Sequence, residues 1–324
     1  MSDYLKLVRI KNLLIIAATQ YLMRYAVIIP ILKYEGFEPQ FSHLSFLFLV
    51  LTTVFLAAAG YVINDYFDTQ TDILNKPESV IVGKTVKRQT AMILHIVLNG
   101  IALVLAFYIS YTIGFWKLTY IYILITALLW LYSAWFKRQL LVGNIIVAFL
   151  TAMVPLLTVL YEIPPLNKAY GKTLLMLNMD FSILLHWILG FTIFAFLSNL
   201  IREVIKDIED FEGDKAYGRR SLPVVAGIQT SKIVINSLIA LSILLLIVAW
   251  FFFIQNKLSL VILKIVSAGY IAFAIILPFI ILFIKTLKAK TKSDWTTASG
   301  LSKLIMLFGI LFALIIRFSY IAYT

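Results

Sequence analysis

The sequence predicts an all-α integral membrane protein, a bundle of nine transmembrane helices. Of its 324 residues, 62% are hydrophobic and 14% are charged, and the mean hydropathy is +0.96. Soluble domains are closer to half apolar and a quarter charged. Long apolar runs recur along the chain, each long enough to cross about 30 Å of hydrocarbon as a helix. We therefore expect residues 1–324 to form a single membrane domain.

The expected spans follow one another in order. The first, 12–32, is too long for the apolar region of a signal peptide and lacks a small-residue cleavage site, so we expect it to stay as a spanning helix. The others are expected at 44–63, 91–113, 116–136, 141–161, 183–202, 232–254, 258–284 and 301–323. Between the fifth and sixth, 162–182 contains Pro164 and Pro165 and is expected to turn on the outer side.

Lysine and arginine are distributed unevenly between the two sides of this arrangement. With the N-terminus inside, the inside segments hold 20 of these residues and the outside segments hold six. This bias predicts a cytoplasmic N-terminus in the cytoplasmic (inner) membrane. The two longest inside connections, 64–90 and 202–231, would then form cytoplasmic caps.

Composition also excludes several kinds of site. There is no cysteine, so disulfides and thiolate ligands are excluded, and three scattered histidines argue against zinc. The net charge of +12 reflects the topology, so we expect the bilayer as a partner, no nucleic acid and no obligate protein partner.

Two acidic motifs lie in the two long inside connections. Each has aspartates at i, i+3 and i+7, with matching positions 142 residues apart: Asp65, Asp68 and Asp72 in the first motif, and Asp207, Asp210 and Asp214 in the second. On a helix this spacing aligns three carboxylates on one face. Six such groups would repel one another without cations, and oxygen ligands suit Mg²⁺ shared with substrate phosphates. The motifs predict six metal ligands for a phosphate or diphosphate site.

The constant offset also indicates an internal repeat. Spans 1–4 and 5–8 would form two parallel four-helix repeats, with span 9 appended and the site between the halves. The alternatives are that the acidic helix ends are simply solvated, or that a transporter carries cations on them. Carboxylates at membrane depth are energetically costly, so they favour a functional site over simply solvated helix ends. Their position at helix ends on one side of the membrane argues against a transporter, which would bind near the midplane.

The role of the lysine and arginine residues near the motifs has two interpretations. Arg202 and Lys206 could form ordinary pairs within their helix, or Lys206 could neutralise the charge of a leaving group. Lys84 and Arg88 are either ordinary inside charges or part of a lid that closes over a diphosphate.

Three polar or aromatic residues within spans complete the set of candidates. Asn12 begins the first span at the cytoplasmic side and could reach the site. Tyr132, near the cytoplasmic end of the fourth span, could form a cavity wall whose ring stabilises a cation. Arg24 is deep in the first span and should face the bundle interior.

Taken together, the motifs resemble those of the UbiA superfamily of intramembrane prenyltransferases. The two signatures, as they stand here, are Asn64-Asp65-x-x-Asp68-x-x-x-Asp72 and Lys206-Asp207-x-x-Asp210-x-x-x-Asp214. Further agreement comes from Tyr132-Ser133, Lys137-Arg138, Gly143-Asn144 and the segment 218–223. The run 202–214 is similar to the branch that prenylates glycerol-phosphate lipids, the digeranylgeranylglyceryl phosphate synthase-like branch.

The resemblance implies Mg²⁺-dependent transfer of an isoprenyl group from an allylic, geranylgeranyl-like diphosphate to a membrane-associated acceptor. A prenylglycerol phosphate is the expected acceptor, with an aromatic quinone precursor or haem as alternatives. The implied catalytic residues are Asp68, Asp72, Asp210, Asp214 and Lys206. The implied substrate-binding residues are Asn64, Arg202, Lys84, Arg88, Tyr132 and Asn12.

One position departs from the family pattern. The family commonly has an Arg-Pro pair in the first connection, and Ser79 stands where that arginine is expected. Lys84, Lys87 or Arg88 could replace its diphosphate contact, or the activity could be altered. A CDP-alcohol phosphotransferase, which also uses aspartates and Mg²⁺, would need a Gly- and Arg-containing aspartate signature that the chain lacks.

Overall fold

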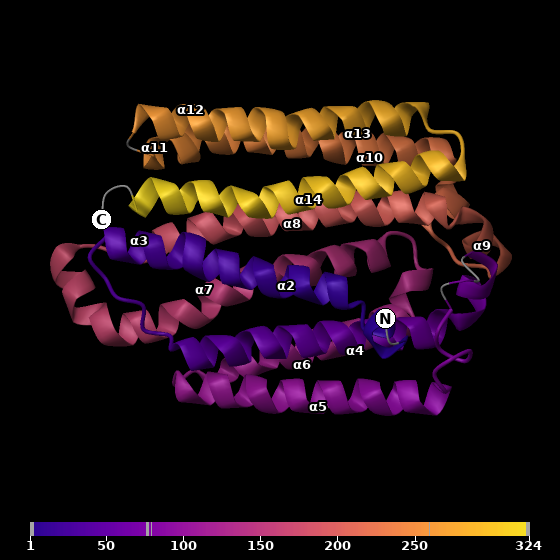
Figure 1. Cartoon of the computed structure of the whole chain (residues 1–324), viewed down its shortest axis with the longest axis horizontal. Helices are drawn as coiled ribbons and strands as arrows, with labels where there is room; N and C mark the ends of the chain where they lie inside the picture. The colour runs from indigo at the N-terminus through magenta and orange to yellow at the C-terminus, as the bar shows by residue number, and fades with distance from the viewer. Residues whose placement is uncertain (1–2, 76–77, 79, 259, 322–324) are drawn as a thin grey trace.

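The computed structural model describes residues 3–75, 78, 80–258 and 260–321, and within these residues it is a bundle of long helices (Figure 1). This described part contains nine helical segments that are long and apolar enough to span a membrane, and each overlaps one predicted span. The prediction of a nine-helix membrane bundle is confirmed.

The first half of the chain supplies four of these segments. Its helices are α1 (Asp3–Leu7), α2 (Ile10–Leu22), η1 (Met23–Ile28), α3 (Ile29–Tyr34), α4 (His43–Asn75), α5 (Arg88–Thr112), η3 (Trp116–Leu118), α6 (Thr119–Ala134) and η4 (Phe136–Arg138). The π-helical turn η1 joins α2 to α3, so these three helices make one span.

The second half supplies the other five. Its helices are α7 (Val142–Leu177), α8 (Ser182–Glu209), α9 (Phe211–Ala216), α10 (Leu222–Ala249), η5 (Trp250–Ile254), α11 (Gln255–Lys257), α12 (Val261–Tyr270), η6 (Ile271–Ile276), α13 (Leu277–Lys288) and α14 (Lys292–Ile321). Helices α10 to α11 form one span and α12 to α13 another.

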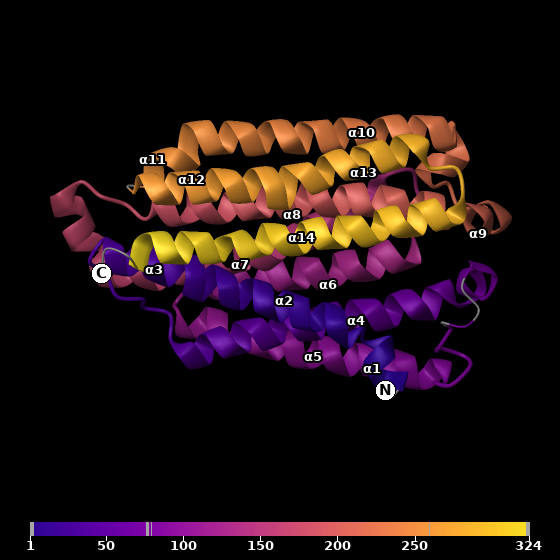
Figure 2. The same cartoon turned by 45° about the horizontal axis from the view of Figure 1, so that its top comes forward.

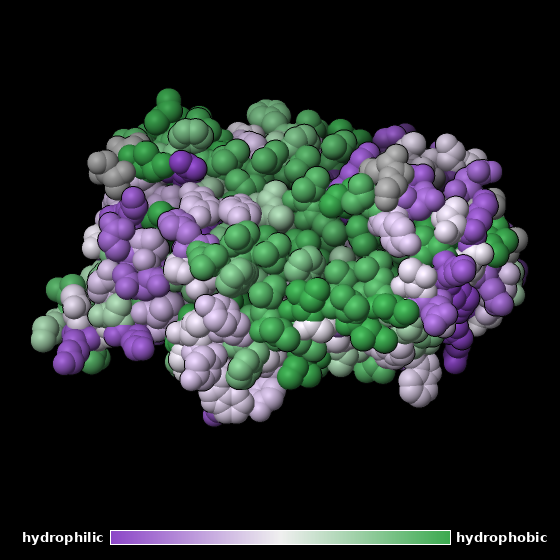
Figure 3. Space-filling model, turned by 60° about the horizontal axis from the view of Figure 1, so that its bottom comes forward, coloured by the Kyte–Doolittle hydropathy of each residue, from purple (hydrophilic) through white to green (hydrophobic). Residues whose placement is uncertain are grey.

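The halves occupy opposite sides of the bundle. Helices α4, α5 and α6 lie on one side, α10, α12 and α13 lie on the other, and α2, α7, α8 and α14 run between them (Figures 1 and 2). Apolar residues form a broad band across the middle of the surface, and polar residues gather at its two ends (Figure 3). The motif helices α4 and α8 therefore end at one polar end, near α9.

The ends of the motif helices differ from the prediction. Helix α4 continues to Asn75 and α8 to Glu209, so much of the expected cap segments 64–90 and 202–231 is helical. Apolar composition marks where a span leaves the hydrocarbon, whereas a helix can run on into water through polar residues.

The prediction of a turn at 162–182 is wrong for most of this segment. Helix α7 contains Pro164 and Pro165 and runs on to Leu177, where Asn178 ends it with φ of 51°. The far part of α7 bends away from the rest (Figure 1). Proline bends a helix, but in a membrane bundle the carbonyls it leaves can find other partners.

Arg24 has a specific partner at the opposite end of the bundle from the motifs. Its Nη1 lies 3.4 Å from Oε2 of Glu162 in α7, and both side chains are only 1% exposed. Glu162 Oε1 also accepts hydrogen bonds of 3.2 Å from the backbone N–H groups of Gln40 and Phe41. The ring of Phe46 lies 4.6 Å from the Arg24 guanidinium. This pair joins the first span, the connection before α4, and α7.

Candidate active site

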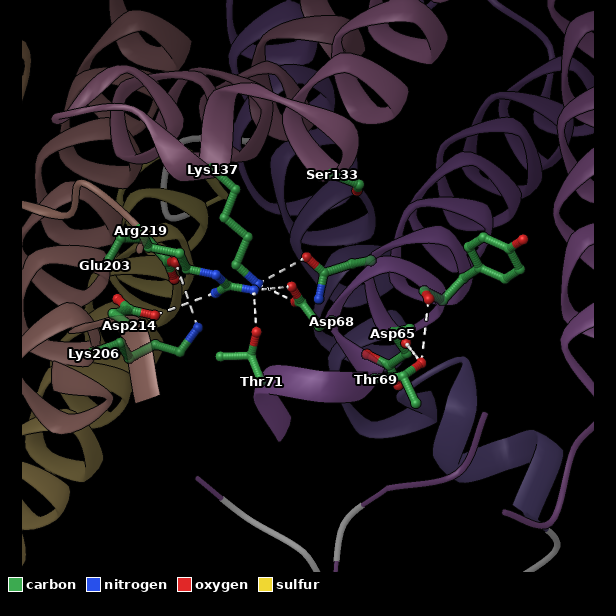
Figure 4. A network of polar contacts seen from close by, with 12 residues as sticks. Asp65, Asp68, Thr69, Thr71, Ser133, Lys137, Glu203, Lys206, Asp214 and Arg219 are labelled. Carbon is green, nitrogen blue, oxygen red and sulfur yellow. Dashed lines mark hydrogen bonds and ion pairs between the residues drawn. The ribbon is translucent and has the colours of Figure 1, made fainter. Parts of the chain in front are cut away.

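Asp68 is the centre of a charged network near the C-terminal end of α4. Its two carboxylate oxygens pair with different cations, Oδ2 with Lys137 and Oδ1 with Arg219 (Figure 4). Lys137 also donates to Oδ1 of Asn64 at 3.1 Å. Arg219 donates to Thr71 Oγ1 at 3.1 Å, so both cations bind the face of α4 that carries the motif.

Arg219 connects the two motifs. Its Nη1 lies 3.3 Å from Oδ1 of Asp214, while its Nη2 pairs with Asp68. One guanidinium therefore sits between carboxylates that are 146 residues apart in the sequence. Two carboxylates brought this close stabilise a cation between them.

The two cations come from short connections that are joined to each other. Lys137 lies in η4 and Arg219 follows α9, and the backbone N–H of Arg220 donates to the carbonyl of Arg138 at 3.1 Å. A Cβ added at Gly143 would lie 2.9 Å from the Lys137 Cα. Glycine at this position thus lets the start of α7 approach the Lys137 turn closely.

Local electrostatics keep these cations charged. Burial alone would lower the pKa of Lys137, but Asp68 outweighs it and raises that pKa above the ordinary value. The pKa of Arg219 is raised in the same way by Asp68 and Asp214, against the effect of burial. Burial raises the pKa of Asp214, against the lowering effect of Arg219. The site therefore carries fixed positive charge and a carboxyl that a further cation would stabilise as the anion.

Asp65 of the first motif also has a direct charged partner. Arg9 Nη2 donates to its Oδ1 at 2.7 Å, and the Arg9 guanidinium lies 4.9 Å from the centre of the Tyr61 ring. Leu7, two residues earlier, is fully buried against Val62. The N-terminal segment thus packs on the motif helix.

The second motif is not one continuous helix. Asp207 lies in α8 and accepts a 2.9 Å hydrogen bond from Asn144 of α7. Asp210 lies at the junction where α8 ends and α9 begins, and Asp214 lies in α9. The N–H of Asp214 still donates to the carbonyl of Asp210 at 3.0 Å, so the helical register is nearly kept.

Arg202 and Lys206 contact an acid of their own helix that is not in the motif. Glu203 Oε1 lies 2.9 Å from Arg202 Nη1, and its Oε2 lies 3.4 Å from Lys206 Nζ. The Lys206 amine points toward the network around Asp68 and Arg219 (Figure 4).

The remaining expected residues lie at different distances from the network. The Tyr132 ring centre lies 6.0 Å from Lys137 Nζ, beside the network. Arg88 stacks on the Tyr66 ring at 4.1 Å and donates to Thr69, beside the motif. Lys84 is exposed in a turn after α4, and Asn12 is half-buried near the start of α2. Ser79 lies outside the described residues.

The donor set fits a divalent cation. Within the described part of the chain, no three acidic or histidine side chains are close enough to hold a metal by themselves. Mg²⁺, however, is usually held by one or two carboxylates together with substrate phosphates and waters. Arg219 between Asp68 and Asp214 marks a position where the two motifs already stabilise positive charge.

A family model described as the UbiA prenyltransferase family matches residues 36–299. The chain belongs to this family. It is therefore a prenyltransferase, and the nine long apolar helices among its described residues make it an integral membrane protein.

UbiA relatives of known name are similar over most of the chain. The digeranylgeranylglyceryl phosphate synthase of Methanothermobacter thermautotrophicus is 33% identical over 260 residues, which is 79% of each chain. That of Methanosphaera stadtmanae is 34% identical over 221 residues, 68% of this chain and 71% of the relative.

Solved structures share the fold. One of digeranylgeranylglyceryl phosphate synthase has a TM-score of 0.65 at 24% identity, covering 96% of this chain and 98% of its own. A UbiA homologue from Archaeoglobus fulgidus bound to DMAPP and Mg²⁺ has a TM-score of 0.55 at 18% identity, covering 96% and 99%.

Sequence reasoning missed several members of the network as site residues. The sequence analysis gives no site role to Arg9, and Lys137, Asn144 and Arg219 appear in it only within segments that resemble those of the family. What these residues share in the sequence is that each is polar or cationic and lies near the end of a helix on the side of the bundle that holds the motifs. Only the fold shows which of these face the aspartates.

Proposed function

We propose that this enzyme transfers an isoprenyl group from an allylic isoprenyl diphosphate to the hydroxyl group of a prenylglycerol phosphate, forming an ether lipid. The observation that supports binding of the diphosphate donor is the pairing of two cations, Lys137 and Arg219, with Asp68. The support for the acceptor half is the similarity to relatives named digeranylgeranylglyceryl phosphate synthase.

The donor diphosphate binds at the Asp68 network. Lys137 and Arg219 each carry a fixed positive charge there, and Lys137 remains 25% exposed, so its amine is accessible to a ligand. Tyr132 and Asn64 lie beside Lys137 and would limit how the diphosphate is oriented. Phosphate oxygens would replace the carboxylate oxygens as partners of the two cations.

Mg²⁺ would be held by carboxylates of the two motifs, with Asp68 and Asp214 the pair already joined by one cation. When bound, Mg²⁺ neutralises the carboxylates and the negative charge that develops on the leaving diphosphate. The A. fulgidus homologue was solved bound to DMAPP and Mg²⁺, which supports an allylic diphosphate donor used together with Mg²⁺.

The transfer breaks the allylic C–O bond, and the diphosphate leaves with the bonding electron pair. Lys137 and Arg219 stabilise the charge that this pair brings to the leaving group. The acceptor oxygen attacks the allylic carbon to form the ether bond, and its proton passes to the released diphosphate. The apolar spans below the site exclude water, which would otherwise capture the allylic cation.

The site would face the cytoplasm. The 20-to-6 bias of Lys and Arg supports an inside N-terminus, and both motif helices end on that side. The segments 64–90 and 202–231 would cover it as caps on a single domain. Geranylgeranyl diphosphate is the donor that fits the named relatives.

Mass spectrometry of lipid products tests the proposal. The purified enzyme is given Mg²⁺, geranylgeranyl diphosphate, and geranylgeranylglyceryl phosphate together with a hydroxybenzoate. A Mg²⁺-dependent ether lipid is the expected product. A prenylated hydroxybenzoate instead would show that the acceptor is an aromatic quinone precursor. If neither product forms while a control enzyme is active under the same conditions, the proposed substrates are refuted.

A further inference from the structure

The group formed by Arg202, Glu203 and Lys206 has more positive than negative charge. Two cations share one carboxylate, which leaves a net charge of +1. None of its charged contacts described above involves an aspartate of either motif. Both cations are only partly exposed, and positive charge in excess of its carboxylate in such a place is suited to an additional anion.

The hydrogen bonding of Arg202 is incomplete. Its Nη1 reaches Glu203, but its Nε is buried and has no hydrogen-bond partner within the described part of the chain. A buried N–H without an acceptor is destabilising, and a ligand oxygen would supply the missing acceptor. The guanidinium fork is also the side chain that best matches phosphate oxygens.

Lys206 is available to the same ligand. Its side chain is 31% exposed, and its contact with Glu203, at 3.4 Å, is long for a charge-assisted hydrogen bond. An ammonium group has three donors, so Lys206 can keep Glu203 and still bind another oxygen. Glu203 is only 10% exposed, and it holds both cations in place.

The position of this group matches the second substrate. Arg202 precedes Asp207 by five residues on α8, about 7.5 Å deeper along the helix axis. The Lys206 amine points toward the network around Asp68 and Arg219 (Figure 4), so the group faces the same space as that network. An anion bound here would lie next to the donor diphosphate and nearer to the hydrocarbon.

From these contacts we propose that Arg202 and Lys206, held by Glu203, bind the phosphate monoester of the lipid acceptor and so select a phosphorylated acceptor. The inference rests on the proposed function and names the acceptor-recognition residues of that site. In a glycerol phosphate the reacting hydroxyl is next to the carbon that bears the phosphate. Binding the phosphate therefore places the hydroxyl a few ångströms away, beside the donor.

This assignment changes the role expected for Lys206. Neutralising the leaving diphosphate belongs to Lys137 and Arg219, which contact the motif aspartates directly. Lys206 is instead paired with Glu203, together with Arg202. The two anionic substrates thus have separate cationic groups, which keeps the acceptor phosphate out of the donor position.

The experiment compares two acceptors that differ only in the phosphate. Purified wild type, Arg202→Gln, Arg202→Lys and Lys206→Gln are assayed in detergent with saturating geranylgeranyl diphosphate and Mg²⁺. The acceptors are geranylgeranylglyceryl phosphate and geranylgeranylglycerol, which lacks the phosphate. Lys288→Gln is the matched control, because it removes an exposed positive charge on α13.

The expected result is an acceptor-specific change. Arg202→Gln and Lys206→Gln should each raise KM for the phosphorylated acceptor about tenfold or more. KM for the phosphate-free acceptor and KM for the donor should change less than about threefold by the same reasoning. Arg202→Lys should recover part of the loss, since charge is kept and the guanidinium fork is lost.

Two results would overturn the inference: an equal rise of KM for both acceptors, or a rise confined to the donor. Wild-type failure to use the phosphorylated acceptor would instead refute the proposed function, and the inference with it. A variant that does not fold would lose both activities together, and Arg202→Lys would then decide the question through its KM ratio for the two acceptors.

Discussion

Two buried charge clusters lie at opposite ends of this bundle, and they are built differently. Arg24 and Glu162 are each 1% exposed, and Glu162 fills its remaining capacity with backbone N–H groups. Around Asp68 the carboxylate is equally enclosed at 4%, but Lys137 is 25% exposed. One cluster is closed to ligands and the other keeps a cation accessible.

The difference separates structural charge from functional charge. Charge inside a membrane protein is costly and often marks a functional site. Here the Arg24 pair ties three segments together and offers no accessible donor, so we assign it to stability. The accessible cations near Asp68 are assigned to substrate binding.

The largest expected effect comes from breaking the closed pair. Glu162→Gln leaves the Arg24 charge buried without its counter-charge, which costs about 3–5 kcal/mol. The apparent Tm of the detergent-solubilised enzyme should fall by roughly 10 °C. Thermal unfolding followed by tryptophan fluorescence measures this fall.

An apolar double variant is the control. Arg24→Met with Glu162→Leu removes both charges, and we expect it to be more stable than Glu162→Gln. If Glu162→Gln unfolds at the wild-type temperature, the pair does not hold the bundle together.

The accessible cluster should show the opposite pattern. Lys137→Gln removes a donor that stabilises the leaving diphosphate, which lowers kcat by about 10²–10³-fold. Its Tm without substrates should stay near the wild-type value, because Asp68 keeps Arg219 as a partner. Steady-state kinetics with Mg²⁺ and donor measure kcat, and activity equal to that of wild type would contradict the donor site.

A smaller effect is expected where packing positions Lys137. At Gly143 a Cβ would lie 2.9 Å from the Lys137 Cα and 3.0 Å from the Phe136 carbonyl oxygen. Both neighbours are backbone atoms, so Gly143→Ala must shift the turn, at a cost of about 1–3 kcal/mol. We expect lower kcat/KM for the donor, and an unchanged kcat/KM would show that the turn moves without consequence.

The smallest effect is expected at Arg88. It stacks on Tyr66 and donates to Thr69, next to the motif but not to its aspartates. Arg88→Gln should change KM for the donor less than about threefold, as for surface substitutions in general. A much larger rise in KM for the donor would instead support the interpretation that Arg88 is part of a lid over the diphosphate.

Much of the fold was predictable from the sequence, because hydrophobic runs alone locate helices in a bilayer. The nine spans and the two motif helices follow from this rule. The rule fails at span ends, as in α4 and α8, and at Pro164 and Pro165, where the bundle tolerates a bend in α7.

Less of the site was predictable, because its pairs join distant parts of the chain. The regular spacing of the aspartates identifies them in the sequence. Lys137 and Arg219, in contrast, reach Asp68 from connections that are 69 and 151 residues away. Glu162 gives no local sign that it is the partner of Arg24, and Glu203 none that it holds two cations. Such contacts depend on tertiary packing.

The most direct test of the distinction is ligand-induced stabilisation, measured in one thermal-shift series. Wild type, Lys137→Gln and Glu162→Gln are each heated with and without Mg²⁺ and geranylgeranyl diphosphate. We predict that Lys137→Gln keeps the wild-type Tm without ligand but loses most of the shift on binding, whereas Glu162→Gln has a lower Tm and keeps the shift. A lowered Tm with a full ligand shift in Lys137→Gln would contradict the account.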